Sequence, residues 1–244
     1  MSSTRKSALV AGVFFIVAAA AAIVGLILYQ DVLHRRDYIL GGSGSDAPVF
    51  LGAFFEILLA ISVVGTAVTL FPIVRRQNEG AALGYVAGRV LEATVIVVGI
   101  MSLLSVVTLR QAFAGEPGAG GASLVVAGRA LVAMHDWTFL FGPNLALGVN
   151  TSLLAYLMFR SGLVPRVIAV LGLVGGPLIF ASGTAVLFGL YGQTSAWGAV
   201  TALPVFAWEM SLAVWMIVKG FNPAPWAQDE TSPSSRTVRS SSGV

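Results

Sequence analysis

The apolar residues of the 244-residue chain gather in six long runs, separated by short polar or glycine-rich segments. A transmembrane helix needs about 20 mainly apolar residues at a rise of about 1.5 Å per residue, and each run reaches that length. The six predicted spans are Ala8–Tyr29, Val49–Val74, Leu83–Leu109, Trp137–Phe159, Val167–Leu190 and Trp197–Val218. The pattern therefore predicts an all-α fold, an integral membrane bundle of six transmembrane helices.

Two other segments complete the predicted organisation. Ala122–Met134 is apolar apart from Arg129 but too short to cross a bilayer, so we expect one short interfacial helix before the fourth span. Residues 222–244 are rich in Ser, Thr and Pro without periodicity, which predicts a disordered cytoplasmic tail after a membrane domain of residues 1–221. The first run is longer than the roughly 7–15 apolar residues of a signal peptide, so we expect a retained span.

The basic residues predict the orientation of the spans, because loops rich in Lys and Arg stay in the cytoplasm. With a cytoplasmic N-terminus, nine basic residues fall on that side: Arg5, Lys6, Arg75, Arg76, Arg160, Arg166, Lys219, Arg236 and Arg239. Four fall outside, namely Arg35, Arg36, Arg110 and Arg129. We therefore expect a multi-pass protein of the bacterial plasma membrane with both termini in the cytoplasm.

Composition narrows the classes of function. Only 10% of the residues are charged against 57% hydrophobic, which excludes a soluble globular or a disordered protein. The absence of cysteine excludes thiolate metal sites and cysteine nucleophiles, and two histidines cannot form a three-histidine site. The basic residues are scattered, so the net charge of +3 does not indicate a nucleic-acid partner. We expect no metal, no cofactor and no nucleic acid.

Four charged residues lie inside the predicted spans: Glu56, Arg89, Glu92 and Glu209. Each costs roughly 2.5–3.5 kcal/mol near a helix centre, so they must face the bundle interior with partners or water. Helical rise places Asn150 at the depth of Arg89 and Glu209, and Asn144 at the depth of Glu56. We expect a polar column shared by the second, third, fourth and sixth spans.

The charges in this column do not balance, because one arginine faces three glutamates. We therefore expect at least one of Glu56 and Glu92 to be protonated at neutral pH, and both are candidate proton donors or acceptors if the protein is an enzyme. Buried ion pairs and amides also tie transmembrane helices together in a fixed register. A structural role for Arg89 with Glu92 or Glu209 therefore stays an open alternative.

Aromatic and interfacial residues add further candidates. Tyr85 could stabilise a cation with its ring. His135 and Asp136 do not face each other on a helix, so we expect a helix start there, with Trp137 in the interfacial aromatic belt. In the alternative interpretation, Asp136 lines the outer mouth of the column. The candidate ligand-binding residues are Glu56, Tyr85, Arg89, Glu92, Asp136, Trp137, Asn144, Asn150 and Glu209.

Two glycine pairs, Gly84-x-x-x-Gly88 and Gly172-x-x-x-Gly176, predict places where helices approach closely.

Several short motifs occur together in this chain. They are Gly52–Glu56, Leu70-Phe71-Pro72, Arg76-Gln77-Asn78-Glu79, Leu83-Gly84-Tyr85, Arg89-Val90-Leu91-Glu92-Ala93, His135-Asp136-Trp137, Gly142-Pro143, Leu163-Val164-Pro165-Arg166, Gly175-Gly176-Pro177, Glu209 and Lys219-Gly220-Phe221. Together they resemble the bacterial membrane family catalogued as domain-of-unknown-function family 4386. The resemblance covers roughly Ser7 to Phe221 and implies the multi-pass architecture. It leaves the activity open.

Three functions fit the sequence. The first is a bundle whose polar pocket binds a small amphipathic molecule or membrane lipid. The second is a membrane-embedded acid/base enzyme, similar to a cyclase or isomerase, acting on an isoprenoid or lipid. The third is a proton-coupled transporter in which Glu56 and Glu92 relay protons, although six spans without an evident repeat are few for alternating access unless the protein forms a homodimer.

Overall fold

The computed structural model describes residues 3–41, 45–113 and 121–222, and these are helical without a strand. Six helical segments are long and apolar enough to cross a membrane. They are α1 (Ser3–Leu28), α3 (Ala47–Val74), α4 (Glu79–Ala112), Gly121–Ser161, α7 (Arg166–Leu187) and α8 (Ala196–Val218). The predicted all-α bundle with six candidate spans is confirmed. The predicted tail, apart from Asn222, lies outside the described residues.

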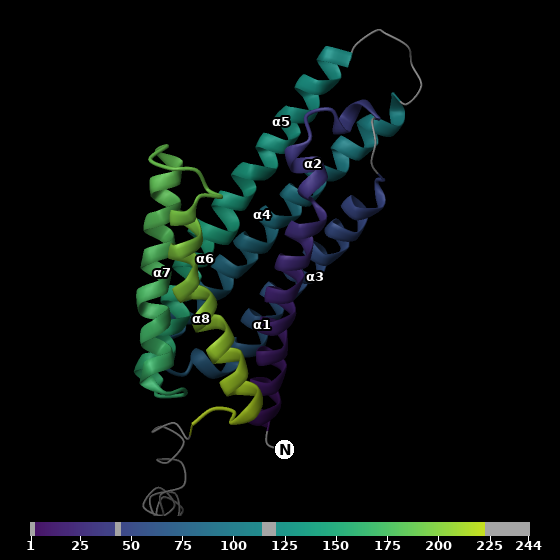
Figure 1. Cartoon of the computed structure of the whole chain (residues 1–244). Helices are drawn as coiled ribbons and strands as arrows, with labels where there is room; N and C mark the ends of the chain where they lie inside the picture. The colour runs from purple at the N-terminus through teal and green to yellow at the C-terminus, as the bar shows by residue number, and fades with distance from the viewer. Residues whose placement is uncertain (1–2, 42–44, 114–120, 223–244) are drawn as a thin grey trace, which may run out of the picture.

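The helices pack mainly against their neighbours in the chain, and α1 closes the bundle by contacting both α3 and α8. α4 lies centrally, with contacts to α3, α5 (Gly121–Leu140) and α6 (Leu147–Ser161). The start of α1 and the end of α8 lie at the same end of the bundle (Figure 1). The largest cluster of buried apolar side chains lies toward this end and joins α1, α3, α4, α6, α7 and α8.

Local sequence signals explain where several helices begin and end. The Asn78 side chain accepts a hydrogen bond of 2.9 Å from the amide of Ala81 and caps α4, and Ser195 caps α8 through the amide of Gly198 at 3.3 Å. Gly162 ends α6 with a φ of +64°, a left-handed conformation that glycine adopts without strain. The connections that begin or end at these residues are short, so the consecutive helices that they join are antiparallel and adjacent.

The fourth span differs from the sequence expectation. The structure has one continuous helix over Gly121–Ser161, in which α5 and α6 are joined by a π-helical segment, η2 (Phe141–Ala146). Residues 121–161 contain no separate interfacial helix and no helix start at Asp136. The reason is that α5 contains no proline and packs along α4, while η2 accommodates Pro143, which has no amide hydrogen to donate.

This long helix makes one end of the molecule project. Its 41 residues span about 60 Å, twice the hydrocarbon core of a bilayer. In Figure 1, α5 and the ends of α3 and α4 extend with α2 (Gln30–His34) beyond α7 and α8. A separate apolar cluster and a 2.8 Å ion pair between Arg110 and Asp46 hold this projection together.

Glycines allow the closest approach between α6 and α7. A Cβ added to Gly176 would lie 2.8 Å from the carbonyl oxygen of Gly148, and one added to Gly172 would lie 2.7 Å from Ala155 Cβ on α6. The close packing predicted for this pair is confirmed. In the other pair it is confirmed at Gly88, whose added Cβ would collide with Asn150, but not at Gly84, where the nearest atom is 3.4 Å away.

A Gly176→Ala substitution tests the α6–α7 contact. The added methyl group meets backbone, which cannot rotate away, so we expect the free energy of unfolding to fall by about 1–3 kcal/mol. Reversible unfolding of the detergent-solubilised protein, followed by tryptophan fluorescence, measures the change. Gly192→Ala is the matched control, because nothing lies within 4 Å of the added Cβ there. Equal effects of the two substitutions would contradict the packing argument.

Candidate functional site

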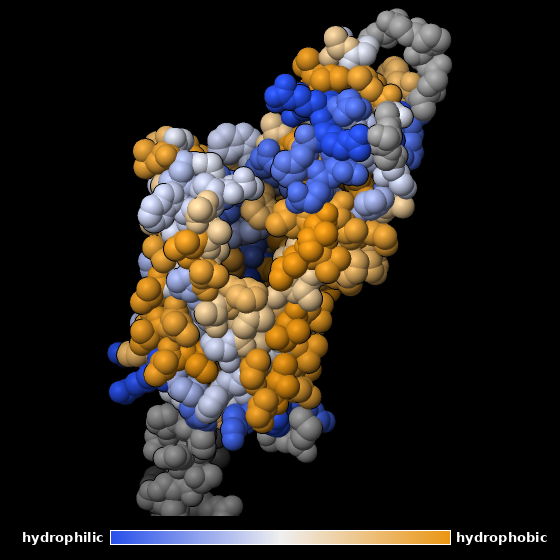
Figure 2. All heavy atoms as spheres, viewed as in Figure 1, coloured by the Kyte–Doolittle hydropathy of each residue, from blue (hydrophilic) through white to orange (hydrophobic). Residues whose placement is uncertain are grey.

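An elongated cavity of about 230 Å³ lies inside the bundle, lined by residues of α1, α3, α4, α8 and the long helix of α5, η2 and α6. Along α1 its lining runs from Ala18 to just past the end of the helix at Tyr29, a distance of about 17 Å. Three alanines of α1, Ala18, Ala19 and Ala22, leave the space that larger side chains would fill. Figure 2 shows a hollow between α1 and α8, with apolar surface on both sides and hydrophilic residues at its base.

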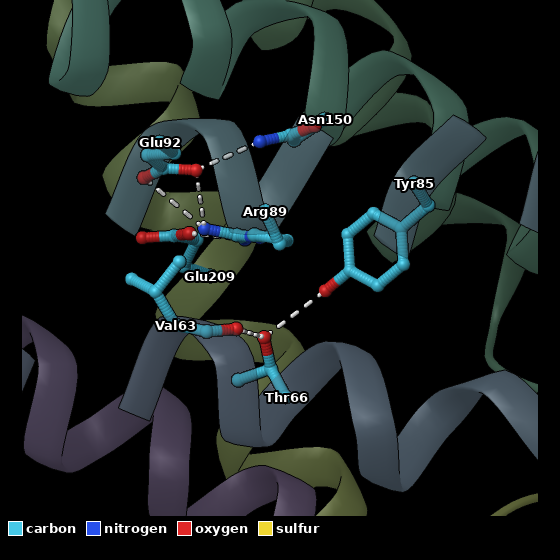
Figure 3. Close-up of polar contacts among 7 residues, drawn as sticks. All are labelled: Val63, Thr66, Tyr85, Arg89, Glu92, Asn150 and Glu209. Atoms are coloured by element: carbon cyan, nitrogen blue, oxygen red, sulfur yellow. Dashed lines mark hydrogen bonds and ion pairs between the residues drawn. The ribbon is translucent and has the colours of Figure 1, made fainter. Parts of the chain in front are cut away.

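A charged network lies at the end of the cavity nearer the start of α1 and the end of α8, which we call the inner end, the opposite end being the outer end. Figure 3 shows the contacts of this network. The two terminal nitrogens of Arg89 lie 3.2 Å from Glu92 Oε2 and 3.2 Å from Glu209 Oε1. Asn150 donates a 2.8 Å hydrogen bond to the same Glu92 oxygen. Arg89 and Glu92 are three residues apart on one face of α4, whereas Glu209 comes from α8 and Asn150 from α6. The network therefore connects α4, α6 and α8.

Aromatic rings hold Arg89 from two further directions. Its guanidinium carbon lies 5.6 Å from the ring centre of Phe15 on α1 and 5.5 Å from that of Tyr85 on α4. The Tyr85 hydroxyl lies 3.2 Å from the Thr66 hydroxyl on α3, which donates to the carbonyl of Val63. Cation–π contacts are strongest where water is excluded, and Arg89 is only 3% exposed.

Gly88 makes room for the amide of this network. A Cβ at this position would overlap Asn150 Oδ1, so only glycine lets the Asn150 side chain reach across to Glu92. The sequence pattern indicated a close helix approach at Gly88, and the structure shows that the approaching group is a polar side chain. Gly88 of the predicted glycine pair therefore lies next to Asn150, one of the predicted polar residues.

A second polar group lies at the outer end of the cavity, which we call the outer site: Tyr29, Glu56 and His135. The rings of Tyr29 and His135 meet edge to face at 5.8 Å between centroids. Tyr29 Oη, Glu56 Oε2 and His135 Nδ1 are buried and make no hydrogen bond to any residue that the structure describes. Nδ1 lies 3.7 Å from Asp136 Oδ1, which is too long for a hydrogen bond.

Two glycines shape the outer site. A Cβ on Gly52 would lie 2.5 Å from the Tyr29 ring, and one on Gly25 would lie 3.1 Å from Glu56 Cγ. Because both positions lack a side chain, α1 and α3 come close enough to direct Tyr29 and Glu56 toward the same space.

The structure brings together most of the residues that the sequence singled out. Four of them line the cavity: Glu56, Arg89, Glu92 and Glu209. Tyr85 and Asn150 do not line it but contact Arg89 and Glu92 directly. The cavity lies among the second, third, fourth and sixth spans, which were expected to share a polar column, and α1 contributes a further wall.

Three candidates lie away from the cavity. The Asp136 side chain is 65% exposed, and Asp136 lines a different pocket on the projecting part of the molecule. Trp137 is exposed beside α4 in an apolar groove. Asn144 lies in η2 and donates a 3.2 Å hydrogen bond to the carbonyl of Phe139, so the π-helical turn engages its amide locally.

Sequence reasoning missed Tyr29 and His135 as cavity residues. An aromatic residue at the end of a span is typical of the membrane interface, so Tyr29 carried no separate signal. His135 was placed at a helix start, whereas it lies inside α5 and is only 4% exposed. Within residues 3–41, 45–113 and 121–222, no three His, Asp or Glu side chains gather in a way that could hold a metal ion.

An Arg89→Leu substitution tests the charged network. It leaves Glu92 and Glu209 buried without a cation, so we expect unfolding to become easier by about 3–5 kcal/mol. Denaturant unfolding in detergent micelles measures the loss. Arg160→Leu, at an exposed position in the last turn of α6, is the control and should cost less than about 1 kcal/mol. Similar losses of stability in both variants would contradict a specific stabilising role of Arg89.

The chain matches a known protein family over most of its length. A family model described as "Domain of unknown function (DUF4386)" matches residues 10–220, which include all cavity-lining residues and nearly the whole of the six candidate spans. No curated protein and no solved structure matches the chain. Because the match covers most of the chain, the protein belongs to the DUF4386 family of domains of unknown function.

Proposed function

We propose that this protein binds a small amphipathic or lipid-like molecule in the cavity between α1, α3, α4 and the long fourth span. The observation that carries the proposal is the lining itself, which combines apolar walls along the length of the cavity with polar groups at both ends. Small-molecule sites in proteins are typically mostly apolar concavities with a few convergent polar groups.

The size and position of the cavity favour a ligand that comes from the membrane. Its volume of about 230 Å³ exceeds the roughly 150 Å³ of an engineered cavity that takes benzene. The hollow in Figure 2 lies between the apolar surfaces of α1 and α8, facing the direction in which lipid would surround the bundle. A hydrocarbon chain that enters from the side would meet apolar surface beside the hollow.

The inner network supplies a fixed polar end for such a ligand. Arg89 already contacts two carboxylates and two rings, so its position is set before any ligand arrives. A preorganised site loses less conformational entropy on binding than a flexible one. The same contacts stabilise the bundle, so the structural role of the network and its role in the site are compatible.

Acid/base catalysis on an isoprenoid or lipid is the second candidate function. The observation that favours it is Glu56, a carboxyl group on the cavity wall with one oxygen that has no hydrogen-bond partner among the described residues. A carboxyl group in an apolar pocket can donate or accept a proton at a bound substrate. The enzyme would use the same cavity, so ligand binding is the first step to establish.

Filling the cavity tests the proposed function. We expect wild-type protein purified in a mild detergent to carry a lipid-like molecule visible by native mass spectrometry. Ala22→Phe places a ring in the α1 wall and should abolish this adduct. Ala20→Phe is the matched control, because Ala20 is exposed on the same helix and does not line the cavity. An empty wild-type protein, or equal occupancy of both variants, would contradict the proposal.

Membrane orientation is part of the same proposal: we place the protein in the bacterial plasma membrane with both termini in the cytoplasm, on the basis of nine basic residues against four. The chain has no cysteine, so one introduced thiol is the sole target of a maleimide. Asp37→Cys should react with a membrane-impermeant maleimide in intact cells, and Gln77→Cys only after lysis. The reverse pattern would invert the topology.

A further inference from the structure

We infer that the outer site binds the head group of the ligand, and that this head group is a primary ammonium on a single hydrocarbon chain. The inference rests on the proposed function, because it names the chemistry of the molecule that the cavity takes. It is built on Tyr29, Glu56 and His135, which come from the end of α1, from α3 and from α5. Sequence alone did not bring these three residues together.

Three buried polar atoms of the outer site lack a hydrogen-bond partner. Tyr29 is 1% exposed and His135 is 4% exposed, yet neither Tyr29 Oη nor His135 Nδ1 has a partner at hydrogen-bonding distance among the described residues, although the Tyr29 hydroxyl and the Glu56 carboxyl interact electrostatically. The Oε2 atom of Glu56 is buried and has no partner either, although Glu56 as a whole is partly exposed. Buried polar atoms are nearly always satisfied by protein, water or ligand, so three of them around one cavity indicate a polar occupant.

The three unpartnered atoms share the ability to accept a hydrogen bond. A carboxylate oxygen, a phenol oxygen and the Nδ1 atom of a histidine protonated on Nε2 can all accept a hydrogen bond. An ammonium group has three donors and no acceptor, so its hydrogen-bonding capacity matches a set of three acceptor atoms. A hydroxyl group has a single donor, and a carboxylate head would meet Glu56 as a second anion.

Negative side chains outnumber positive ones around the cavity. The lining holds three glutamates, Glu56, Glu92 and Glu209, against one arginine. Arg89 lies within 4 Å of the other two carboxylates but forms no ion pair with Glu56. His135 interacts electrostatically with Glu56, and Asp136 Oδ1 lies 3.7 Å from the His135 Nδ1 atom. A cation at the outer site therefore neutralises the carboxylate that no arginine or lysine reaches among the described residues.

The surroundings of the outer site suit a cation with an apolar chain. Tyr29 and Phe139 line the same cavity, and aromatic rings attract an ammonium group. Ala22, Ile23 and Leu26 on α1 continue the lining as an apolar wall that accepts hydrocarbon. The head group thus lies at the polar end and the chain along α1.

The experiment measures binding of three probes of equal chain length, dodecylamine, dodecanol and dodecanoate, to the full-length protein in maltoside micelles at pH 7. We expect dodecylamine to bind with a dissociation constant at least tenfold below those of the other two. Glu56→Gln should weaken dodecylamine at least tenfold and leave dodecanol unchanged, because the amide keeps the shape and removes the charge. Tyr29→Phe should weaken dodecylamine about threefold to tenfold by removing one acceptor.

Glu79→Gln is the matched control, because it makes the same substitution at an exposed position outside the cavity. It should bind dodecylamine like the wild type. The thermal midpoint of each variant identifies those that fail to fold, and Tyr29→Phe serves as the test if Glu56→Gln does not fold.

Two failures are distinguishable. Equal binding of the three probes, or undiminished dodecylamine binding in Glu56→Gln and Tyr29→Phe, overturns the ammonium inference. If Ala22→Phe still abolishes binding of all probes in that case, the proposed cavity function stands without it. If none of the three probes binds the wild-type protein, the proposed function itself falls.

Discussion

The buried guanidinium of Arg89 is the constraint on which the arrangement of the bundle depends. In a medium that excludes water, a charge must be met by partners from within the protein, and Arg89 finds them on α1, α4 and α8. Because Glu92 also accepts from Asn150, the network extends to α6. The helices that supply these groups can neither rotate nor slide without leaving a charge unpaired.

The need to pair Arg89 also accounts for several other features of the bundle. Gly88 is needed so that Asn150 can reach Glu92, and the alanines of α1 leave a space beside the network that becomes the cavity. The π-helical turn at Pro143 lets one helix supply His135 to the outer end of the cavity and Asn150 to the inner network. π-helical segments recur at functional sites because they change the register of the residues that follow.

The two polar ends of the cavity differ in what they leave unsatisfied. At the inner end both carboxylates contact a cation or an amide, and the atoms without a hydrogen-bond partner among the described residues are Arg89 Nε and Asn150 Oδ1. At the outer site, buried oxygen and nitrogen atoms have no partner among the described residues. A ligand gains more from contacts that replace missing hydrogen bonds than from contacts that compete with existing ion pairs. The unpartnered carboxylate oxygen of Glu56 is therefore the reason that the inferred head group is assigned to the outer site.

The sequence by itself determined the six spans and the identity of the intramembrane charges, because hydropathy and span length are properties of contiguous residues. It also paired Arg89 with Glu92, since a separation of three residues on a helix is local geometry. Only the tertiary structure decided that Tyr29, Glu56 and His135 meet, because they lie on three different helices and their approach depends on Gly25 and Gly52. It likewise showed that Asp136 and Trp137 point away from the cavity, since the continuous helix through Gly121–Ser161 sets their direction by tertiary packing that no local pattern encodes.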